Sequence, residues 1–333
     1  GNTIAGPWVE QNFKGQSVTT DGTSYFIVGD RINTTDPDLT ELGVLKVNSN
    51  LQSGVTEANL VSAGVPHHGT AITVSSTNDI IVCGYTYGDE AAPPPNQSFI
   101  FGFSTDLDTS AAWTQTRYYP GAIDGNSRVT SKTIAENDAG RFIWTTLNNS
   151  GSGFELIRQE AGVDDAFPGD ATSLLPNETV GSEIGDFARA NIGGVLVQNV
   201  LTPSNEMNIS TFSTSNPTTP QTSVNISLSG FSVVPHSVVQ DQSSGDYVIL
   251  AKTDKNRDEV NTRSDTDFYI TKVGADGVVS EATGFATTVG GTGSEEGVAI
   301  VQADDGGYVI LGTMRNTNDK DLMVLLKINN NGE

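Results

Sequence analysis

The chain contains the stretch Gly306-Gly307-Tyr308-Val309-Ile310-Leu311-Gly312, an apolar run that follows a turn and closes on a glycine. Near the other end, Ser24-Tyr25-Phe26-Ile27-Val28-Gly29 has the same form. Four similar runs lie between them. We call the last residue of each run its marker, and the six markers are at positions 29, 84, 145, 199, 251 and 312. Self-similarity at a nearly constant spacing, 52 to 61 residues, indicates a repeat architecture with six copies.

Each copy contains further strand-like segments around its first apolar run. A second apolar run follows a polar loop, at residues 42–47, 99–103, 154–158, 207–212, 268–273 and 322–328. A shorter alternating stretch precedes the first run, for example at residues 17–20 and 237–240. No window sustains apolar residues at helical spacing, so the chain is predicted to be all-β. Three clear strands and a weaker fourth in each copy are typical of a propeller blade.

The two ends of the chain complete this prediction. The last copy stops after its third strand, whereas residues 7–13 precede the first copy without a blade of their own. A strand from residues 7–13 that joins the last blade would close the ring and remove two open sheet edges. We therefore predict a single domain over residues 1–333, a six-bladed β-propeller with four-stranded antiparallel blades. The predicted blades are residues 15–62, 69–120, 129–178, 184–229, 234–290 and 296–333.

The last copy also resembles a known group of proteins. Residues 295–313 read Glu-Glu-Gly-Val-Ala-Ile-Val-Gln-Ala-Asp-Asp-Gly-Gly-Tyr-Val-Ile-Leu-Gly-Thr, and residues 321–328 read Asp-Leu-Met-Val-Leu-Leu-Lys-Ile. Both segments resemble the repeats of secreted bacterial β-propeller proteins and lipoproteins. The resemblance implies the propeller fold and an extracytoplasmic location, in the medium, in the periplasm or at the cell surface. It implies no activity, because such propellers share no catalytic signature.

Charge and composition exclude several classes of function. The chain has 40 acidic residues against 17 Lys and Arg, a formal net charge of −23, which repels phosphate backbones and anionic lipids. We therefore expect no nucleic-acid partner. No segment reaches the ~18 apolar residues that a membrane span requires. The one cysteine, Cys83, excludes an intrachain disulfide and lies in an apolar run, so it is predicted to be a small buried residue.

Acidic residues gather in the loops predicted for blades 1, 5 and 6. Carboxylate oxygens are the ligands that Ca²⁺ prefers, so these loops hold candidate calcium ligands. The candidates are Asp36, Asp38, Asp265, Asp267, Asp319 and Asp321. However, no loop has the compact acidic spacing of an EF-hand site. Solvated acidic loops are the favoured interpretation, and the sequence indicates no required cofactor.

Histidine and tyrosine side chains form a second group, around blade 2. All are predicted in segments that open onto one face: His67, His68, Tyr85, Tyr87, Tyr118 and Tyr119. Exposed aromatic rings at a loop face can stack on sugar rings or anchor a peptide. The competing interpretation, which we favour for these rings, is that they cover blade edges. A histidine pair without a third ligand is weak evidence for a metal.

Two cations form a third group. Lys132 and Arg189 are the basic residues on the strands predicted to line the central channel. They could meet an anionic ligand there. Pairing with a neighbouring carboxylate such as Glu136 or Asp186 is the favoured alternative.

No catalytic residue can be assigned, because the chain lacks a G-x-S-x-G elbow, an H-E-x-x-H helix motif and a phosphate loop. The leading interpretation is a non-catalytic, extracytoplasmic binding or scaffolding propeller that holds a glycan or a protein at a loop face. Two alternatives stay open. One is a carbohydrate hydrolase or lyase that uses carboxylates at the mouth of the central channel. The other is a structural or adhesive module of a larger surface assembly.

Overall fold

The computed structural model describes residues 13–32, 40–48, 56–60, 67–86, 97–107, 117–119, 128–136, 139–149, 154–161, 172–173, 178–180, 184–189, 195–201, 206–213, 216–226, 231–254, 266–274, 285–290, 293–315 and 321–333. For some strand residues only the backbone is described. Every regular element in these ranges is a β-strand, which confirms the all-β prediction. None of them holds a helix of the length and hydropathy needed to cross a bilayer.

Residues 5–179 form one compact unit, which we call the N-terminal unit, with three sheets. Sheet 1 has the order β1 (Phe13–Thr20), β2 (Ser24–Ile32), β3 (Thr40–Asn48), β4 (Thr56–Leu60). Sheet 2 has the order β5 (His67–Val74), β6 (Ile80–Thr86), β7 (Gln97–Phe103), β8 (Arg117–Tyr119). Sheet 3 has the order β9 (Arg128–Glu136), β10 (Phe142–Asn149), β11 (Phe154–Ala161), β12 (Thr172–Ser173), and β13 (Glu178–Val180) also pairs with β11.

Residues 180–333 form the second compact unit, the C-terminal unit. Sheet 4 has the order β14 (Ile184–Arg189), β15 (Val195–Leu201), β16 (Met207–Ser213), β17 (Asn216–Ile226). Sheet 5 has the order β18 (Val233–Gln240), β19 (Tyr247–Thr253), β20 (Asp267–Val273), β21 (Ala286–Val289). Sheet 6 has three strands in the described residues, β22 (Glu295–Gln302), β23 (Tyr308–Arg315), β24 (Asp321–Ile328).

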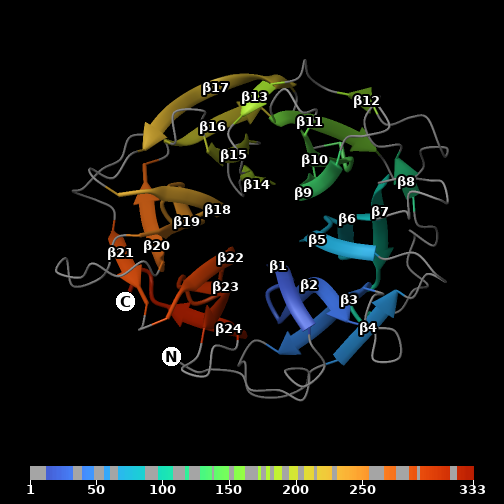
Figure 1. The fold of residues 1–333 in the computed structure, drawn as a ribbon, viewed down its shortest axis with the longest axis horizontal. Helices are drawn as coiled ribbons and strands as arrows, with labels where there is room; N and C mark the ends of the chain where they lie inside the picture. Colours follow the sequence, from blue (N-terminus) through green and yellow to red (C-terminus); the bar gives the residue numbers. More distant parts are fainter. Residues whose placement is uncertain are drawn as a thin grey trace. The chain divides into compact units, whose positions relative to one another are not determined.

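The six predicted copies therefore correspond to six consecutive antiparallel sheets in the described residues (Figure 1). All twelve apolar runs form second or third strands, because one face of each sheet must be buried against the next sheet. Phe26 and Val28 of sheet 1 pack with Ile80 and Phe99 of sheet 2, for example. Comparable apolar clusters join sheets 2 and 3, 4 and 5, and 5 and 6.

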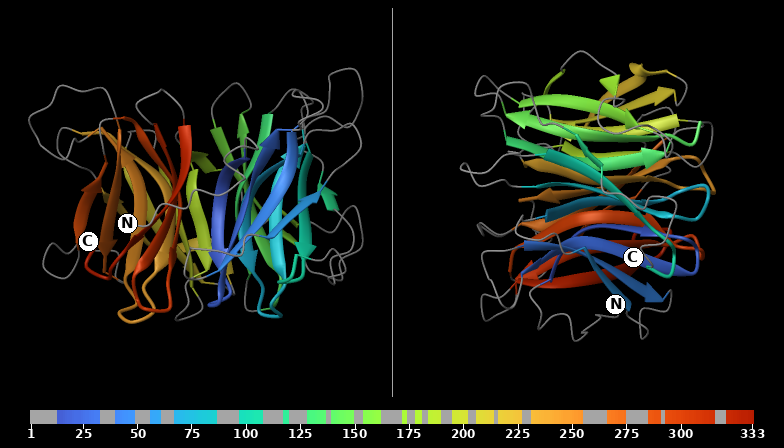
Figure 2. Two further views of the ribbon diagram at one scale, coloured as in Figure 1. Left: turned by 90° about the horizontal axis from the view of Figure 1, so that it is seen from below. Right: turned by 90° about the vertical axis from the view of Figure 1, so that its right-hand side faces the viewer.

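Within each unit the first strands of successive sheets are neighbours. In the N-terminal unit β1 lies beside β5 and β5 beside β9, and in the C-terminal unit β14 lies beside β18 and β18 beside β22. Within each unit the described turns between first and second strands lie at one end of its sheets (Figure 2). We call this the turn end, and the opposite end, where each first strand begins, the loop end. The two ends carry different chemistry, described below.

Every first strand contains a β-bulge, a feature that the sequence pattern does not show. In each sheet one residue of the first strand has no register partner on the second strand. These residues are Gln16, Thr70, Lys132, Gly185, His236 and Val298. A bulge bends its strand and turns the side chains beside it. Its recurrence in all six sheets shows that the repeat extends to backbone geometry.

The marker glycines are explained by close approach at these bulges. A Cβ at Gly29 would overlap the carbonyl oxygen of Lys14, and a Cβ at Gly84 would overlap that of His68. The first strand lies so close to the second at this point that only glycine leaves room for its carbonyl group. In sheets 1, 2, 5 and 6 the marker pairs with the residue that directly precedes the bulge, whereas in sheets 3 and 4 it pairs with the residue that directly follows it.

The turn end is held by aspartates that organise the turns. Asp21 Oδ1 accepts hydrogen bonds from the amides of Thr23 and Ser24, at 2.8 and 2.7 Å. Asp305 Oδ1 accepts from the amide of Gly307, and Asp305 pairs with Lys327, whose Nζ lies 2.6 Å from Oδ2. In sheet 6 the basic residue near the end of the third strand therefore neutralises the turn aspartate of its own sheet, whereas Lys46 of sheet 1 pairs with Asp106, which follows β7 of sheet 2.

Residues 7–12 lie outside the described part of the chain. The closing strand and the single-domain assignment accordingly remain predictions. What the structure establishes is two units of three sheets each, with one bulged first strand in every sheet.

Candidate functional site

The structure places the predicted histidines and one tyrosine at the loop end of sheet 2. His67 and His68 are the first two residues of β5, and their register partners on β6 are Thr86 and Tyr85. The sequence pattern predicts His67 and His68 in the link between blades 1 and 2, and Tyr85 at the start of the long loop of blade 2. In the structure all three residues lie in strands, the histidines in β5 and Tyr85 in β6. Because successive strand residues point to opposite faces, the two histidines have different surroundings.

His67 is a core residue, 1% exposed, and its ring lies 5.5 Å from that of Phe99 at a tilted angle. His68 points the other way. Its ring stacks on Tyr85 with centroids 4.9 Å apart and an interplanar angle of 17°. The histidine pair is thus separated by the alternation of the strand, and only His68 belongs to the site.

His68 also contacts the neighbouring sheet. Its Nδ1 lies 3.2 Å from Oδ2 of Asp30, at the end of β2, and the two side chains are 17% and 19% exposed. We call Asp30, His68 and Tyr85 the rim cluster. Oδ1 of Asp30 is buried and accepts no hydrogen bond in the part of the chain that the structure describes. This oxygen is therefore an acceptor that is unsatisfied within the described residues and is shielded from solvent.

A cation stands beside this carboxylate. Lys14 of β1 is the register partner of Asp30, and its side chain is exposed. Arg31 follows Asp30 in the sequence and is directed to the opposite face of β2, where its register partner on β3 is the buried Glu41. The loop end of sheets 1 and 2 thus offers a donor, an acceptor and a stacked aromatic pair.

A corresponding contact joins sheets 5 and 6. Lys252 Nζ lies 3.5 Å from Oε1 of Glu296. Here the second strand bears the base and the first strand of the next sheet bears the acid, and the two side chains are more exposed, at 29% and 55%. In each case a second-strand residue contacts the first strand of the next sheet. That residue directly follows the marker, as Asp30 follows Gly29 and Lys252 follows Ala251. Position after the marker is therefore the signal by which the sequence could have identified Asp30 as a partner of His68.

The other predicted site residues are only partly placed. Tyr118 and Tyr119 lie in β8, where they are register partners of Phe99 and Ser98, so they form the fourth strand of sheet 2 and not a link to the next sheet. Tyr119 reaches the same loop end as Tyr85, because Ser98 is the partner of both. Tyr87 lies outside the described residues. Lys132 is the bulge residue of β9 and Arg189 ends β14, and only their backbones are described.

The calcium candidates are dispersed. Asp36, Asp38, Asp265 and Asp319 lie outside the described residues, and Asp321 is described by its backbone as the first residue of β24. Asp267 is 3% exposed at the start of β20. The described ranges contain no group of three or more His, Cys, Asp or Glu side chains that could hold a metal ion.

Asp267 has a carboxylate neighbour that the sequence pattern did not suggest. A Cβ at Gly290 would overlap Oδ1 of Asp267 and lie 2.9 Å from Oε2 of Glu295, so both carboxylates border the same point. Glu295 is 1% exposed. Its amide donates a hydrogen bond to the carbonyl oxygen of Thr266 at 2.7 Å, and the Thr266 hydroxyl donates to the carbonyl oxygen of Glu295 at 3.0 Å. Two buried acids from sheets 5 and 6 are thus held together at the loop end.

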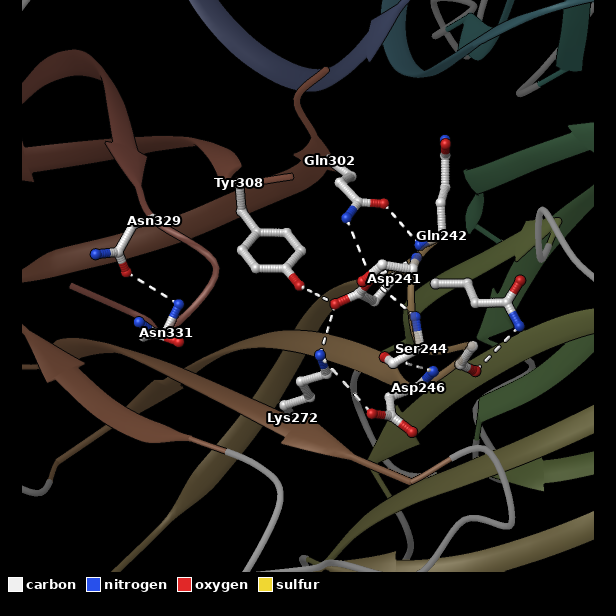
Figure 3. Close-up of polar contacts among 12 residues, drawn as sticks. Asp241, Gln242, Ser244, Asp246, Lys272, Gln302, Tyr308, Asn329 and Asn331 are labelled. Carbon is white, nitrogen blue, oxygen red and sulfur yellow. Dashed lines mark hydrogen bonds and ion pairs between the residues drawn. The ribbon is translucent and has the colours of Figure 1, made fainter. Parts of the chain in front are cut away.

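A polar network of several side chains lies at the turn end of sheets 5 and 6 (Figure 3). Asp241 is 1% exposed and accepts hydrogen bonds from Lys272 Nζ at 2.5 Å and from Tyr308 Oη at 2.7 Å. Gln302 also donates to it, at 3.3 Å, and Lys272 lies 3.7 Å from Asp246. These contacts join residues of both sheets, so the network is a structural junction.

The network also shifts two pKa values. Burial would raise the pKa of Asp241, but the hydrogen bonds from Lys272, Ser243 and Tyr308 outweigh burial and hold the pKa well below its ordinary value. Burial, together with the bond to Asp241, raises the pKa of Tyr308 well above that of a free tyrosine. Both groups therefore keep one protonation state at neutral pH, which suits a structural role.

No family model matches the chain, and no curated protein matches it in sequence. Its fold is similar to that of solved structures. The Hadza microbial sialidase Hz136 has a TM-score of 0.60 and 13% identity over 95% of this chain and 65% of the sialidase, so the chain spans just under two thirds of that protein. The intramolecular trans-sialidase from Ruminococcus gnavus has a TM-score of 0.59 and 9% identity over 96% and 95% of the two chains.

Regucalcin from Agrobacterium tumefaciens, described as a calcium-binding protein, has a TM-score of 0.56 and 11% identity over 94% of this chain and 89% of its own. At such identities the likeness shows the fold alone. The similar structures are β-propeller proteins, which confirms at the level of the fold the propeller resemblance of the repeats.

Proposed function

We propose that the protein is a non-catalytic binding propeller that holds a glycan at the rim cluster. The observation that carries this proposal is the meeting of Asp30, His68 and Tyr85 at the loop end of two adjacent sheets. Aromatic rings give a sugar an apolar surface, and a carboxylate side chain that is 19% exposed can accept hydrogen bonds from sugar hydroxyl groups. A protein ligand is the alternative that the test below also detects.

The rim cluster is suited to binding because its geometry is fixed before a ligand arrives. Asp30 and His68 hold each other across two sheets, and Tyr85 is fixed by its stack on His68. Side chains that are already ordered lose little conformational entropy on binding. The position of the cluster on strands, and not on long loops, supports the same conclusion.

The test is a glycan array and a pull-down of proteins with the full chain, followed by affinity measurements on Tyr85→Ala and His68→Ala. We expect each variant to bind at least tenfold more weakly, which corresponds to about 1.4 kcal/mol. Thr313→Ala is the matched control, because Thr313 follows the marker of sheet 6 as Tyr85 follows that of sheet 2. The absence of any ligand, or equal affinity of the parent and both variants, would overturn the proposal.

A second candidate function, carbohydrate hydrolysis or elimination, is supported by the adjacent carboxylates of Asp267 and Glu295. Retaining glycosidases use two carboxyl groups about 5 Å apart. The test is to measure the release of reducing ends from a panel of polysaccharides. This candidate would be established if the parent protein releases them and Asp267→Asn and Glu295→Gln each lower the rate at least a hundredfold. Both variants must keep the near-ultraviolet circular dichroism spectrum of the parent, which shows that they are folded. No release from any polysaccharide by the parent protein would eliminate it.

We propose an extracytoplasmic setting for this function, on the basis of composition and of the repeat resemblance. Fractionation of the native cells that finds the protein in the cytosol would contradict it. The predicted closing segment loses its last residue, because Phe13 belongs to β1 and pairs with Arg31 of β2. We also propose that the six sheets act as six blades of one propeller, closed by residues 7–12 on the last blade. A variant that lacks residues 1–12 should then unfold at least 5 °C below the parent protein, and an unchanged unfolding temperature would refute closure.

A further inference from the structure

We infer that Asn331 is a modification site, at which the side-chain amide is slowly converted to aspartate and isoaspartate without an enzyme. Asn331 lies in residues 329–333, which follow β24 at the turn end of sheet 6 and which we call the Asn329 turn. This turn belongs to the C-terminal unit, whereas the rim cluster belongs to the N-terminal unit. The proposed binding function therefore does not depend on it.

The pair Asn331-Gly332 supplies the reacting atoms, and it is the one Asn-Gly pair in the sequence. The backbone nitrogen of Gly332 can attack Cγ of Asn331, because glycine has no side chain to hinder the approach. A bond forms between that nitrogen and Cγ, the bond from Cγ to Nδ2 breaks, and Nδ2 leaves as ammonia with the amide proton of Gly332. Water then opens the resulting succinimide ring at either of its two carbonyl groups. One opening gives aspartate, and the other gives isoaspartate, whose main chain runs through Cγ.

The surroundings of Asn331 distinguish it from comparable positions. Three glycines with positive φ in the described residues follow an Asp or an Asn, and they are Gly22, Gly306 and Gly332. Asp21 and Asp305 bear carboxylates that accept hydrogen bonds within their own turns, and a carboxylate has no ammonia to release. Asn331 is exposed, and its side chain makes no hydrogen bond within the described part of the chain.

The Asn329 turn slows the reaction, because it fixes the backbone around the reacting atoms. Asn329 Oδ1 accepts hydrogen bonds from the amides of Asn331 and Glu333, both at 3.0 Å, and Figure 3 shows the first of them. The attacking nitrogen of Gly332 itself donates to the carbonyl oxygen of Asn329, at 3.1 Å. This hydrogen bond must break before the nitrogen can lose its proton and turn toward Cγ. The reaction therefore proceeds from the locally opened turn.

Conversion to isoaspartate should disturb the packing of sheet 6. A Cβ at Gly332 would lie 2.5 Å from Cδ2 of Phe285, so the glycine packs closely against that ring. The Phe285 ring lies 6.1 Å from the ring of Tyr308, whose hydroxyl donates to Asp241. Isoaspartate lengthens the main chain by one carbon and adds a negative charge two residues before Glu333. The turn cannot then keep both its hydrogen bonds and its contact with Phe285, and we expect the modified protein to be less stable.

The experiment is incubation of the full chain at pH 8.5 and 37 °C for four weeks, in buffer and in guanidinium chloride. Peptide mapping by mass spectrometry detects the replacement of the amide nitrogen by oxygen. We expect the product at Asn331 in both samples, and at least tenfold more slowly in buffer, which corresponds to about 1.4 kcal/mol for opening the turn. Asn329→Ala, which removes the acceptor of two turn amides, should raise the rate in buffer at least threefold.

Asn331→Gln should block the reaction, because a glutamine would have to form a larger ring, and this variant should keep its unfolding temperature throughout the incubation. Asn330→Gln is the matched control, since Asn330 is also exposed but precedes an asparagine, and the rate at Asn331 should stay within twofold of the parent. Absence of product in buffer would overturn the site in the native protein. Equal rates in buffer and in guanidinium chloride would overturn protection by the turn. An unchanged unfolding temperature of the modified parent would overturn the link to Phe285.

Discussion

Ser76 and Glu136 are joined by two hydrogen bonds that cross from the turn of sheet 2 to the first strand of sheet 3. The amide of Ser76 donates to Oε2 of Glu136 at 2.6 Å, and its hydroxyl donates to Oε1 at 2.7 Å. In the C-terminal unit the amide of Gln242 donates to Oε1 of Gln302 at 2.8 Å across the same sequence separation of 60 residues. The repeat thus reuses one junction, with a carboxylate in one place and an amide in the other.

This correspondence predicts how Glu136 can be changed. Glu136→Gln should be tolerated at a cost of about 1 kcal/mol, because a glutamine can accept the amide bond as Gln302 does. Glu136→Ala should cost about 2–3 kcal/mol, since Glu136 is 6% exposed and both donors lose their acceptor. Urea unfolding of the two variants measures the difference. Equal stabilities would show that the junction contributes nothing.

Asp241 predicts a dependence of stability on pH. Folding lowers the pKa of this carboxyl, so its contribution is fully present above about pH 4, the ordinary pKa of an unfolded aspartate. It is lost as the pH falls from there toward the lowered pKa of the folded state. Asp241→Asn should therefore cost about 3 kcal/mol at pH 7, and the gap to the parent should narrow below about pH 4.

Denaturant unfolding of both proteins between pH 3 and 7 checks this expectation. Asp305→Asn is the control, because the Asp305 and Lys327 side chains are 60% and 39% exposed. Although its pair with Lys327 also lowers the pKa of Asp305, an exposed ion pair contributes little, and the variant should stay within about 0.5 kcal/mol of the parent. A gap for Asp241→Asn that is constant with pH would contradict the assigned role of the carboxylate.

Gly84 should resist substitution. A Cβ at this position would overlap the carbonyl oxygen of His68 and lie 2.6 Å from the Phe99 ring, so Gly84→Ala should cost about 3 kcal/mol or more. The same change should displace His68 and weaken ligand binding. Gly140→Ala is the control in the same unit, where the positive φ of 70° alone predicts a cost of about 1–2 kcal/mol. Thermal unfolding that ranks Gly140→Ala as the more damaging change would be evidence against the close approach.

Cys83 should be inert in the folded protein. It is 0% exposed in the cluster that joins sheets 2 and 3, as the apolar run around it predicts. A disulfide reagent should label it at least about a thousandfold more slowly in buffer than in urea, which corresponds to an opening free energy of about 4 kcal/mol. Rapid stoichiometric labelling of the native protein would refute this burial.

The strands could be predicted from sequence because each signal is local. Val248 and Ile270 are buried members of apolar runs, and a run bounded by polar turns is typical of a buried strand whatever lies around it. The bulges could not be predicted, because a bulge is a relation between two strands. Nothing in the side chain of Gln16 or Val298 differs from that of a regularly paired residue.

The site was predictable only in part for the same reason. The sequence groups His68 with Tyr85, and the two residues are register partners at one end of sheet 2, because the chain turns back between the two strands that bear them. Asp30 belongs to another sheet, so its contact with His68 depends on how sheets pack. The pairing of Asp267 with Glu295 is likewise a product of sheet packing, which strand patterns do not encode.

The division into two units also determines what optical spectroscopy can observe. Trp8, Trp113 and Trp144 all fall within residues 5–179, so residues 180–333 contain no tryptophan. Indole fluorescence therefore reports the N-terminal unit alone, whereas circular dichroism reports the strands of both. Superimposed denaturation curves from the two signals would mean that all six sheets melt as one cooperative structure, and separated curves would give each unit its own midpoint.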